Sequence, residues 1–225
     1  DVDPVAIADE LLAAGIMNNG QACVAQTRIL APRSRYDEIV GVFTERMAAQ
    51  KVGDPTDFET NVGPLINAAQ RDRVEEYIRV GAEEGARVAA GGGRPEGTGD
   101  GYFVEPTLFV DVTNDMRIAQ EEIFGPVVSV IAYDDLDDAV KIANDSDYGL
   151  SGSVWGGDVD VAIDVARRVR TGTYSVNSYG MAFGSPFGGY KSSGLGRELG
   201  PEGLEEFLEY KTISLPAGTE PTLKF

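Results

Sequence analysis

The chain of 225 residues contains no histidine and a single cysteine, Cys23. A lone thiol cannot form an internal disulfide, so the sequence carries no disulfide framework. Without an imidazole, this thiol cannot be activated as it would be in a Cys–His pair. Histidine and cysteine are also the usual protein ligands of transition metals, so we expect no metal site of that kind. Any chemistry at Cys23 must rely on other groups.

Long apolar segments are also missing. No run reaches the roughly 18 residues that a membrane-spanning helix requires. The chain opens with Asp1-Val2-Asp3-Pro4, which lacks the charged and apolar regions of a secretory signal. We therefore expect a cytoplasmic location and no membrane partner.

Positive charge is scarce, because 19 Lys and Arg residues face 37 Asp and Glu residues, for a formal net charge of −18. Phosphate groups need neutralising cations, so this balance argues against nucleic acid and against anionic membrane surfaces as partners. Solubility is the simplest consequence of the charge. The acidic run at 134–138 lacks the glycine and terminal glutamate of a calcium loop. It favours the start of a helix instead.

Helical and strand patterns alternate along the chain. Apolar residues recur at helical spacing after Asp3, after Ser34 and after Asn67, and again at 139–143, 159–169 and 201–207. Apolar or alternating runs predict strands at 24–30, 87–90, 102–112, 127–133, 151–155 and 173–176. This order predicts an α/β fold with a doubly wound, mostly parallel sheet flanked by helices. Ligands of such sheets usually collect at the carboxyl ends of the strands.

A last alternating strand is predicted at 210–215, after the rest of the fold is complete. Such a strand needs an edge to pair with, either in its own sheet or in a neighbouring subunit. The glycine-rich segments are expected to be structural. Residues 91–101 lack the Gly-Lys-Ser/Thr ending of a phosphate loop, and residues 194–200 miss the spacing of a dinucleotide fingerprint by one residue.

Cys23 follows a turn signal rather than lying in an apolar periodic run. The preceding residues, Asn18 to Ala22, are small or polar, and Val24 begins a predicted strand. A structural cysteine more often lies within an apolar run. At a turn, backbone amides can point at one atom and favour the thiolate, which is the reactive form. Cys23 is therefore a candidate nucleophile.

Four further motifs follow Gly20-Gln21-Ala22-Cys23. They are Glu121-Glu122-Ile123-Phe124-Gly125-Pro126, Asn144 with Tyr148-Gly149-Leu150-Ser151, the loop from Ser185 to Gly194, and Gly196-Arg197-Glu198-Leu199-Gly200. In this order they make the chain resemble the aldehyde dehydrogenase superfamily. The resemblance covers essentially the whole chain, and several ordered motifs are far more specific than any one of them.

The resemblance implies roles for individual residues. Cys23 matches the family's nucleophile, Glu122 its contact to the nicotinamide ribose, and Phe124 the neighbouring aromatic contact. Without the motif match, a carboxylate at a helix end or on the surface would be the simpler interpretation of Glu122. Gln70 and Arg73 occupy positions where some relatives reach the cofactor, although a solvated helix face explains them equally well.

Three residues of the C-terminal loops complete these expectations. The resemblance suggests that Phe187 lines the acyl pocket, and ordinary aromatic packing is the alternative. Lys191 and Arg197 could bind anions, but a structural role within their loop is the expected one.

The implied reaction is the NAD- or NADP-dependent oxidation of a small-molecule aldehyde. Attack by Cys23 gives a thiohemiacetal, loss of hydride gives a thioester, and water, activated by a carboxylate base, releases the acid. A variant could pass the acyl group to coenzyme A instead. The sequence selects neither NAD nor NADP, and it does not identify the aldehyde.

The resemblance also implies how the chain is organised. Residues 1–209 correspond to the catalytic domain, and residues 210–225 to a C-terminal oligomerisation tail, so a homo-oligomer (dimer or tetramer) is expected. The family's cofactor domain, its general-base glutamate and its oxyanion-hole asparagine precede this region. We therefore expect this chain to be the C-terminal half of a longer enzyme and to be inactive alone. The alternative is a non-catalytic folded module that keeps only the association surface.

Overall fold

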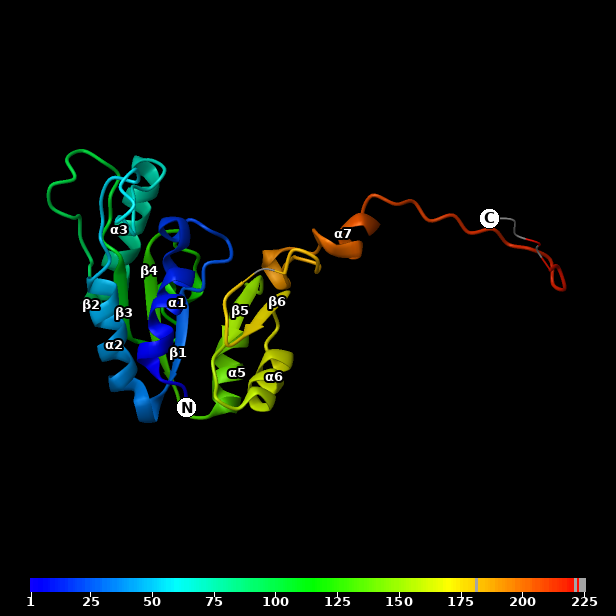
Figure 1. Cartoon of the computed structure of the whole chain (residues 1–225), viewed down its shortest axis with the longest axis horizontal. Helices are drawn as coiled ribbons and strands as arrows, with labels where there is room; N and C mark the ends of the chain where they lie inside the picture. Colours follow the sequence, from blue (N-terminus) through cyan, green and yellow to red (C-terminus); the bar gives the residue numbers. More distant parts are fainter. Residues whose placement is uncertain (181, 221, 223–225) are drawn as a thin grey trace.

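A four-stranded sheet forms the centre of the larger part of the molecule (Figure 1). In the computed structural model, which describes residues 1–180, 182–220 and 222, its strands are β1 (Arg28–Pro32), β4 (Val127–Tyr133), β3 (Thr107–Val112) and β2 (Arg87–Ala90), in that spatial order. β1 and β3 run parallel to β4, and β2 is antiparallel at the edge. The prediction of a mostly parallel sheet flanked by helices is confirmed.

Two further strands, β5 (Ser151–Val154) and β6 (Thr173–Val176), form a separate parallel pair. β5 is joined to the segment before β1 by side chains. The Ser151 hydroxyl donates to the Val24 carbonyl (3.0 Å), and the Ser153 hydroxyl donates to Gln26 Oε1 (2.6 Å). Because these bonds do not form a backbone ladder, the predicted parallel sheet is divided in two.

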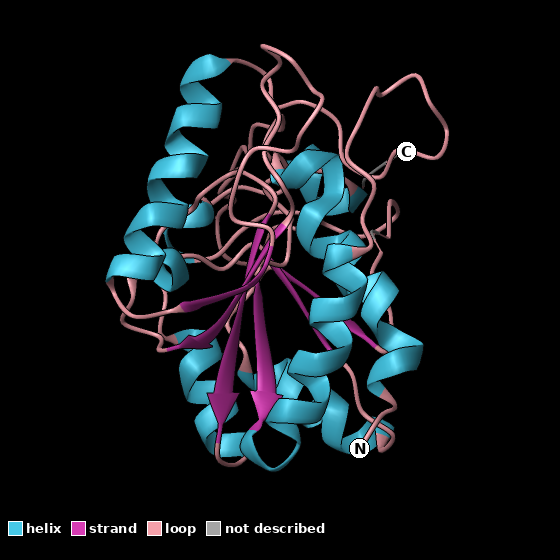
Figure 2. Cartoon of the chain, turned by 90° about the vertical axis from the view of Figure 1, so that its left-hand side faces the viewer, coloured by secondary structure: helices cyan, strands magenta, loops and turns pink. Residues whose placement is uncertain are grey.

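Alternate residues of the central strand enter two different hydrophobic cores. Val128 and Val130 of β4 pack in the core that includes Leu12 and Phe43, which lie on α1 (Pro4–Ile16) and α2 (Tyr36–Ala48). Ile131 packs in the core under α3 (Ala68–Glu83) and the short α4 (Arg117–Gln120). Figure 2 shows helices on both sides of the fanned strands. Burial on both faces is what the β-branched run at 127–133 predicts.

The helices expected after Asp3 and Asn67 begin with a side-chain cap, whereas α2, expected after Ser34, has none. Asp3 accepts from the Val5 amide ahead of α1, and Asn67 accepts from the Gln70 amide ahead of α3. Within the acidic run, Asp135 caps α5 (Leu136–Asn144). α5 and α6 (Val159–Arg168) close a third, small core against β5 and β6.

Two predicted strands start later than expected. β1 begins at Arg28 and not at Val24, because Ala22 to Ala25 form a turn and the Gln26 amide donates to the Ala14 carbonyl of α1. β3 begins at 107, directly after Pro106, whose nitrogen has no proton to give to a strand ladder.

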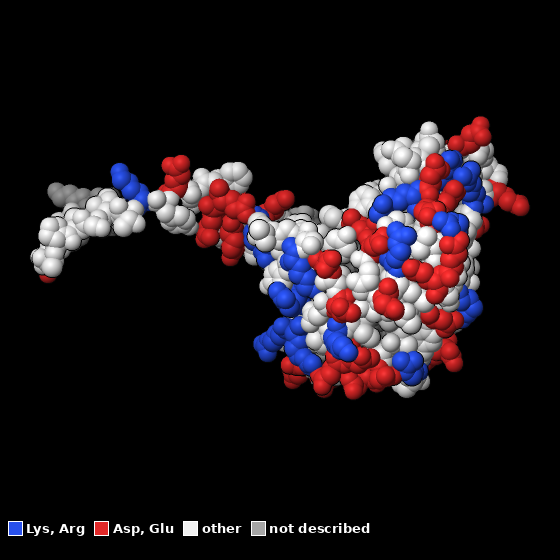
Figure 3. All heavy atoms as spheres, turned by 180° about the vertical axis from the view of Figure 1, so that it is seen from behind, with Lys and Arg blue, Asp and Glu red and all other residues white. Residues whose placement is uncertain are grey.

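The C-terminal segment projects away from the body after α7 (Gly200–Glu205), as Figure 1 shows, and Figure 3 shows the same segment from behind. Residues 210–215 are extended but pair with no strand among the described residues. Their apolar side chains are exposed, with Tyr210 at 83% and Ile213 at 74%. Pairing within the chain's own sheets is therefore not observed, and pairing with a neighbouring subunit stays a prediction.

Candidate functional site

The candidate site residues lie at the amino ends of the parallel strands. Cys23 precedes β1, and the segment from Glu122 to Gly125 directly precedes β4, which is parallel to β1. These candidate residues therefore do not lie at the carboxyl ends, where ligands of such sheets usually collect. The reason is that the turn at Cys23 and the loop at Glu122 to Gly125 both enter their strands, so the chemistry-bearing residues come before the strands and not after them.

The loop before Cys23 is a run of left-handed residues. Asn18, Asn19 and Gly20 have φ angles of 50°, 59° and 71°. Asparagine tolerates this region better than other side chains that carry a Cβ, and glycine is unrestricted in it. The chain thus leaves α1 in a tight coil and reaches Cys23 in the turn that closes from Ala25 N to Ala22 O. The Asn-Asn-Gly sequence is the signal for this geometry.

Side chains of the same loop attach it to a distant segment. Asn19 donates to the Pro64 carbonyl (3.0 Å) and accepts from the Gly63 amide (2.8 Å). Gln21 accepts from the Ile66 amide (3.0 Å). Sequence reasoning missed these anchoring roles, because amide side chains in a turn signal give no indication of a partner more than forty residues away.

The Cys23 thiol is exposed. Within the described part of the chain, no group accepts a hydrogen bond from its backbone amide. An unpartnered amide next to an accessible thiol can donate to an oxygen that develops charge at the attacked carbon.

Gln70 and Arg73 hold the loop that carries Glu122 and Phe124. Gln70 Nε2 donates to the carbonyls of Ile123 (3.1 Å) and Phe124 (2.7 Å), and the Arg73 guanidinium donates to those of Glu122 and Ile123. Phe124 has a φ of 62°, which is unfavourable for a side chain with a Cβ, and its ring is partly exposed. The α3 side chains thus fix a strained backbone, and a direct contact with cofactor stays a prediction.

The two adjacent carboxylates of this loop have different environments. Glu121 is paired with Arg117 through both oxygens (2.9 Å each) and accepts from the Tyr77 hydroxyl (2.6 Å). Hydrogen bonds from Arg117 and then from Tyr77 lower the pKa of Glu121 to about 2. Glu122 is exposed, and its carboxylate has no hydrogen-bond or ion-pair partner among the residues that the structure describes. Glu121 is therefore structural, and Glu122 is available to a ligand.

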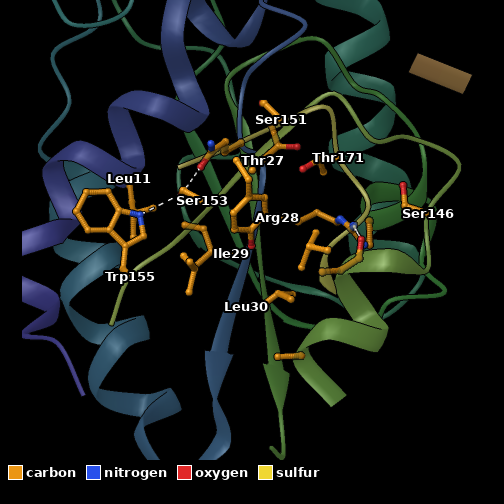
Figure 4. Close-up of a pocket in the computed structure, with 18 of the residues that line it drawn as sticks. Leu11, Thr27, Arg28, Ile29, Leu30, Ser146, Ser151, Ser153, Trp155 and Thr171 are labelled. Atoms are coloured by element: carbon orange, nitrogen blue, oxygen red, sulfur yellow. Dashed lines mark hydrogen bonds between the residues drawn. The ribbon is translucent and has the colours of Figure 1, made fainter. Parts of the chain in front are cut away.

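A cavity of about 570 Å³ lies between β1 and β5, and both Cys23 and Glu122 line it. Figure 4 shows its middle part, where Thr27 to Leu30 face Ser151, Ser153 and Trp155. The Arg28 guanidinium crosses this region and donates to the Ile142 and Ala143 carbonyls at the end of α5. Burial lowers the pKa of Arg28, an effect that Asp145 partly offsets.

The structure does not bring Phe187 to this cavity. Its backbone forms a reciprocal bridge with Glu198 (2.7 and 2.6 Å), and its assignment to the acyl pocket stays a prediction.

Lys191 donates to the Asn144 and Ser146 carbonyls, and burial lowers its pKa. Arg197 donates to the Gly189 and Gly196 carbonyls. Arg197 therefore stabilises its own loop, whereas Lys191 ties that loop to the segment that ends α5.

Comparison with known proteins identifies the family. The model of the aldehyde dehydrogenase family matches residues 1–213. The chain belongs to the aldehyde dehydrogenase family. Its relatives include the geranial dehydrogenase of Castellaniella defragrans, which is 51% identical over 215 residues, covering 96% of this chain and 45% of that protein. The chain therefore spans less than half the length of the curated relatives that it matches.

Solved structures of the family have the same fold. An aldehyde dehydrogenase of Mycobacterium tuberculosis complexed with NAD+ superposes with a TM-score of 0.95 at 56% identity, covering 98% of this chain and 46% of that one. Aldehyde dehydrogenase C of Pseudomonas syringae, a cysteine-to-alanine mutant complexed with NAD+ and octanal, gives a TM-score of 0.93 at 43% identity, covering 97% and 46%.

The described ranges contain neither a cluster of metal ligands nor a membrane-spanning helix. In the described ranges, no group of three or more His, Cys, Asp or Glu side chains is placed to hold a metal ion. The helices there are also too short or too polar to cross a membrane.

Proposed function

We propose that this chain is the catalytic domain of an NAD(P)-dependent aldehyde dehydrogenase and that Cys23 is its nucleophile. The observation that carries the proposal is that the exposed Cys23 thiol and the unpartnered Glu122 carboxylate reach the same cavity in a chain of this family. We propose a cytoplasmic location for it.

Cys23 performs the first chemical step. Its thiolate adds to the aldehyde carbon, the carbon–sulfur bond forms, and the carbonyl π electrons move to the oxygen. The Cys23 N–H, free of other acceptors in the described residues, donates to this oxyanion. The covalent bond holds the carbon in one orientation, which a free aldehyde would lack.

Glu122 and Phe124 would hold the nicotinamide end of the cofactor. A free carboxylate suits the ribose hydroxyls, and an exposed ring suits the flat nicotinamide, so the residues present fit the group. When bound, NAD(P)+ supplies the acceptor for the hydride whose departure turns the thiohemiacetal into a thioester. Support comes from relatives whose structures contain NAD+. Gln70 and Arg73 contribute by fixing the loop.

Hydrolysis of the thioester requires a base. Glu121 is unsuited to this role because Arg117 and Tyr77 occupy both of its oxygens and lower its pKa to about 2, which makes it a weak base. We propose that the base belongs to a part of the protein outside this chain, since its relatives are more than twice as long as the matched region. Water then adds to the thioester carbon, and the acid and the Cys23 thiol are released. Coenzyme A is the alternative acceptor.

Self-association through the tail is part of the proposal. The extended residues 210–215 expose apolar side chains without a partner strand in the described chain. A second copy would pair with this segment and cover it. Such pairing fits a homo-oligomer, a dimer or a tetramer.

The test compares Cys23→Ala with the unchanged sequence, in this chain and in the longer protein where one is encoded. Formation of reduced nicotinamide is followed with geranial and octanal, the aldehydes named for two relatives. We expect turnover only in the longer protein, with loss of at least a thousandfold in Cys23→Ala and nearly unchanged binding of NAD(P)+. Retained turnover in that variant would refute the nucleophile. Absence of turnover in every form would favour the non-catalytic module.

A further inference from the structure

Tyr179 contacts both ends of the loop that carries Cys23. Its hydroxyl donates toward Met17 Sδ (3.6 Å), where the loop leaves α1, and toward the Val24 carbonyl (3.5 Å), directly after Cys23. The contact with sulfur has an ordinary length for a sulfur acceptor, and the contact with the Val24 carbonyl is long and weak. One side chain thus spans the loop from beginning to end.

The backbone of Tyr179 is itself fixed from α1. The Tyr179 amide donates to Glu10 Oε1 (2.8 Å). Tyr179 is half-buried, although its neighbours Ser178 and Gly180 are exposed. The ring therefore enters the protein from a surface segment and is directed at the Cys23 loop, because Glu10 holds its main chain.

The Val24 carbonyl has a second donor, the Ser151 hydroxyl at 3.0 Å. The peptide that follows Cys23 is consequently held from β5 and from Tyr179 at once. Rotation of this peptide would turn Cys23 and change the direction of its thiol. A small displacement of a reacting group can cost a large factor in rate.

We propose that Tyr179 is a positioning residue for Cys23, with Glu10 as the group that fixes Tyr179. The inference rests on the proposed function, because the orientation of the thiol matters for turnover only if Cys23 is the nucleophile. Burial raises the pKa of Tyr179, and the nearby Cys23 raises it further. The phenol therefore keeps its proton at neutral pH and remains a donor.

The rate of alkylation by iodoacetamide measures the reactivity of Cys23 alone, because Cys23 is the only cysteine in the sequence. We expect Tyr179→Phe, which removes only the hydroxyl, to change the alkylation rate by about three- to tenfold, the factor that one hydrogen bond contributes. Tyr36→Phe is the matched control. The Tyr36 hydroxyl also contacts two backbone groups, Val130 O and Asp111 N, but on another part of the sheet. Its removal should leave alkylation unchanged.

A second variant covers the case in which Tyr179→Phe does not fold. Glu10→Ala removes the acceptor of the Tyr179 amide from an exposed helix position and should alter the alkylation rate in the same direction. In the longer protein, Tyr179→Phe should lower kcat and leave KM for NAD(P)+ unchanged, which general loosening would not do. An unchanged alkylation rate in the folded variants, or an equal change in Tyr36→Phe, would overturn the inference. Failure of Cys23 as the nucleophile would show separately, as turnover by Cys23→Ala.

Discussion

Gly20 lies directly against the carbonyl of Gly125. A Cβ built on Gly20 would be 1.8 Å from Gly125 O, and one on Gly125 would be 2.3 Å from Val74 Cγ2. Close packing therefore joins the Cys23 loop to the Glu122 loop and the Glu122 loop to α3, at distances that only glycine allows at positions 20 and 125. This contact keeps the loop of the proposed nucleophile and the loop of the proposed cofactor site side by side.

Gly20→Ala should therefore be strongly destabilising. The added methyl group meets backbone and not a flexible side chain, and the φ of 71° is unfavourable for alanine. We expect a loss of at least ~2 kcal/mol in the free energy of unfolding, measured by chemical denaturation. The matched control is Gly41→Ala, where a Cβ meets nothing within 4 Å in α2. That change should stabilise by ~0.5–1 kcal/mol. Equal effects of the two substitutions would contradict this close packing.

Gln70→Ala removes two hydrogen bonds to the loop that carries Glu122. We expect a loss of about 1–2 kcal/mol in the stability of the cofactor-free chain. In the longer protein, KM for NAD(P)+ should rise by about tenfold, since a looser loop presents Glu122 and Phe124 poorly. Gln50→Ala, which breaks only a local bond to Arg46, should change neither. Unchanged stability with a raised KM would instead indicate that Gln70 acts only by touching the cofactor.

Stability at low pH should depend on Glu121. Its pKa is lowered from 4.5 to about 2, so its contribution is complete above about pH 4.5 and is lost as the pH falls toward 2. The carboxylate is 42% exposed, so solvent screening limits the contribution to about 1 kcal/mol. Denaturation curves of Glu121→Gln should therefore differ from the parent near pH 7 and converge near pH 2. Glu96→Gln, in an exposed loop, should match the parent throughout. A difference that does not vary with pH would contradict this account.

Ile213→Lys should weaken self-association. Ile213 is 74% exposed in the middle of the tail, and a charge there opposes pairing with a second copy. Sedimentation should show an oligomer for the unchanged chain and a smaller species for the variant. Phe58→Lys replaces a fully exposed ring outside the tail and serves as the control. A monomeric parent chain, or identical behaviour of both variants, would argue against the tail as an interface.

Much of the fold could be predicted from local pattern. The caps at Asp3 and Asn67 and the doubly buried run at 127–133 are short-range signals, and the structure contains them as expected. The start of β1 could not be predicted, because the Gln26 amide bonds to Ala14 of α1 instead of continuing the strand. Such competition depends on where another element packs.

The candidate site shows the same division. The sequence alone singles out Cys23 as a solitary thiol in a turn, and motif order alone points to Glu122 and the family. Only the tertiary structure places Cys23 and Glu122, which lie at the amino ends of their strands, on one cavity. It also pairs Glu121 with Arg117 and brings Tyr179 onto the Cys23 loop. The physical reason is the difference in sequence separation over which the two kinds of interaction act. Turn and helix preferences act over a few neighbouring residues, whereas the partners of a side chain are set by packing between segments far apart in the chain.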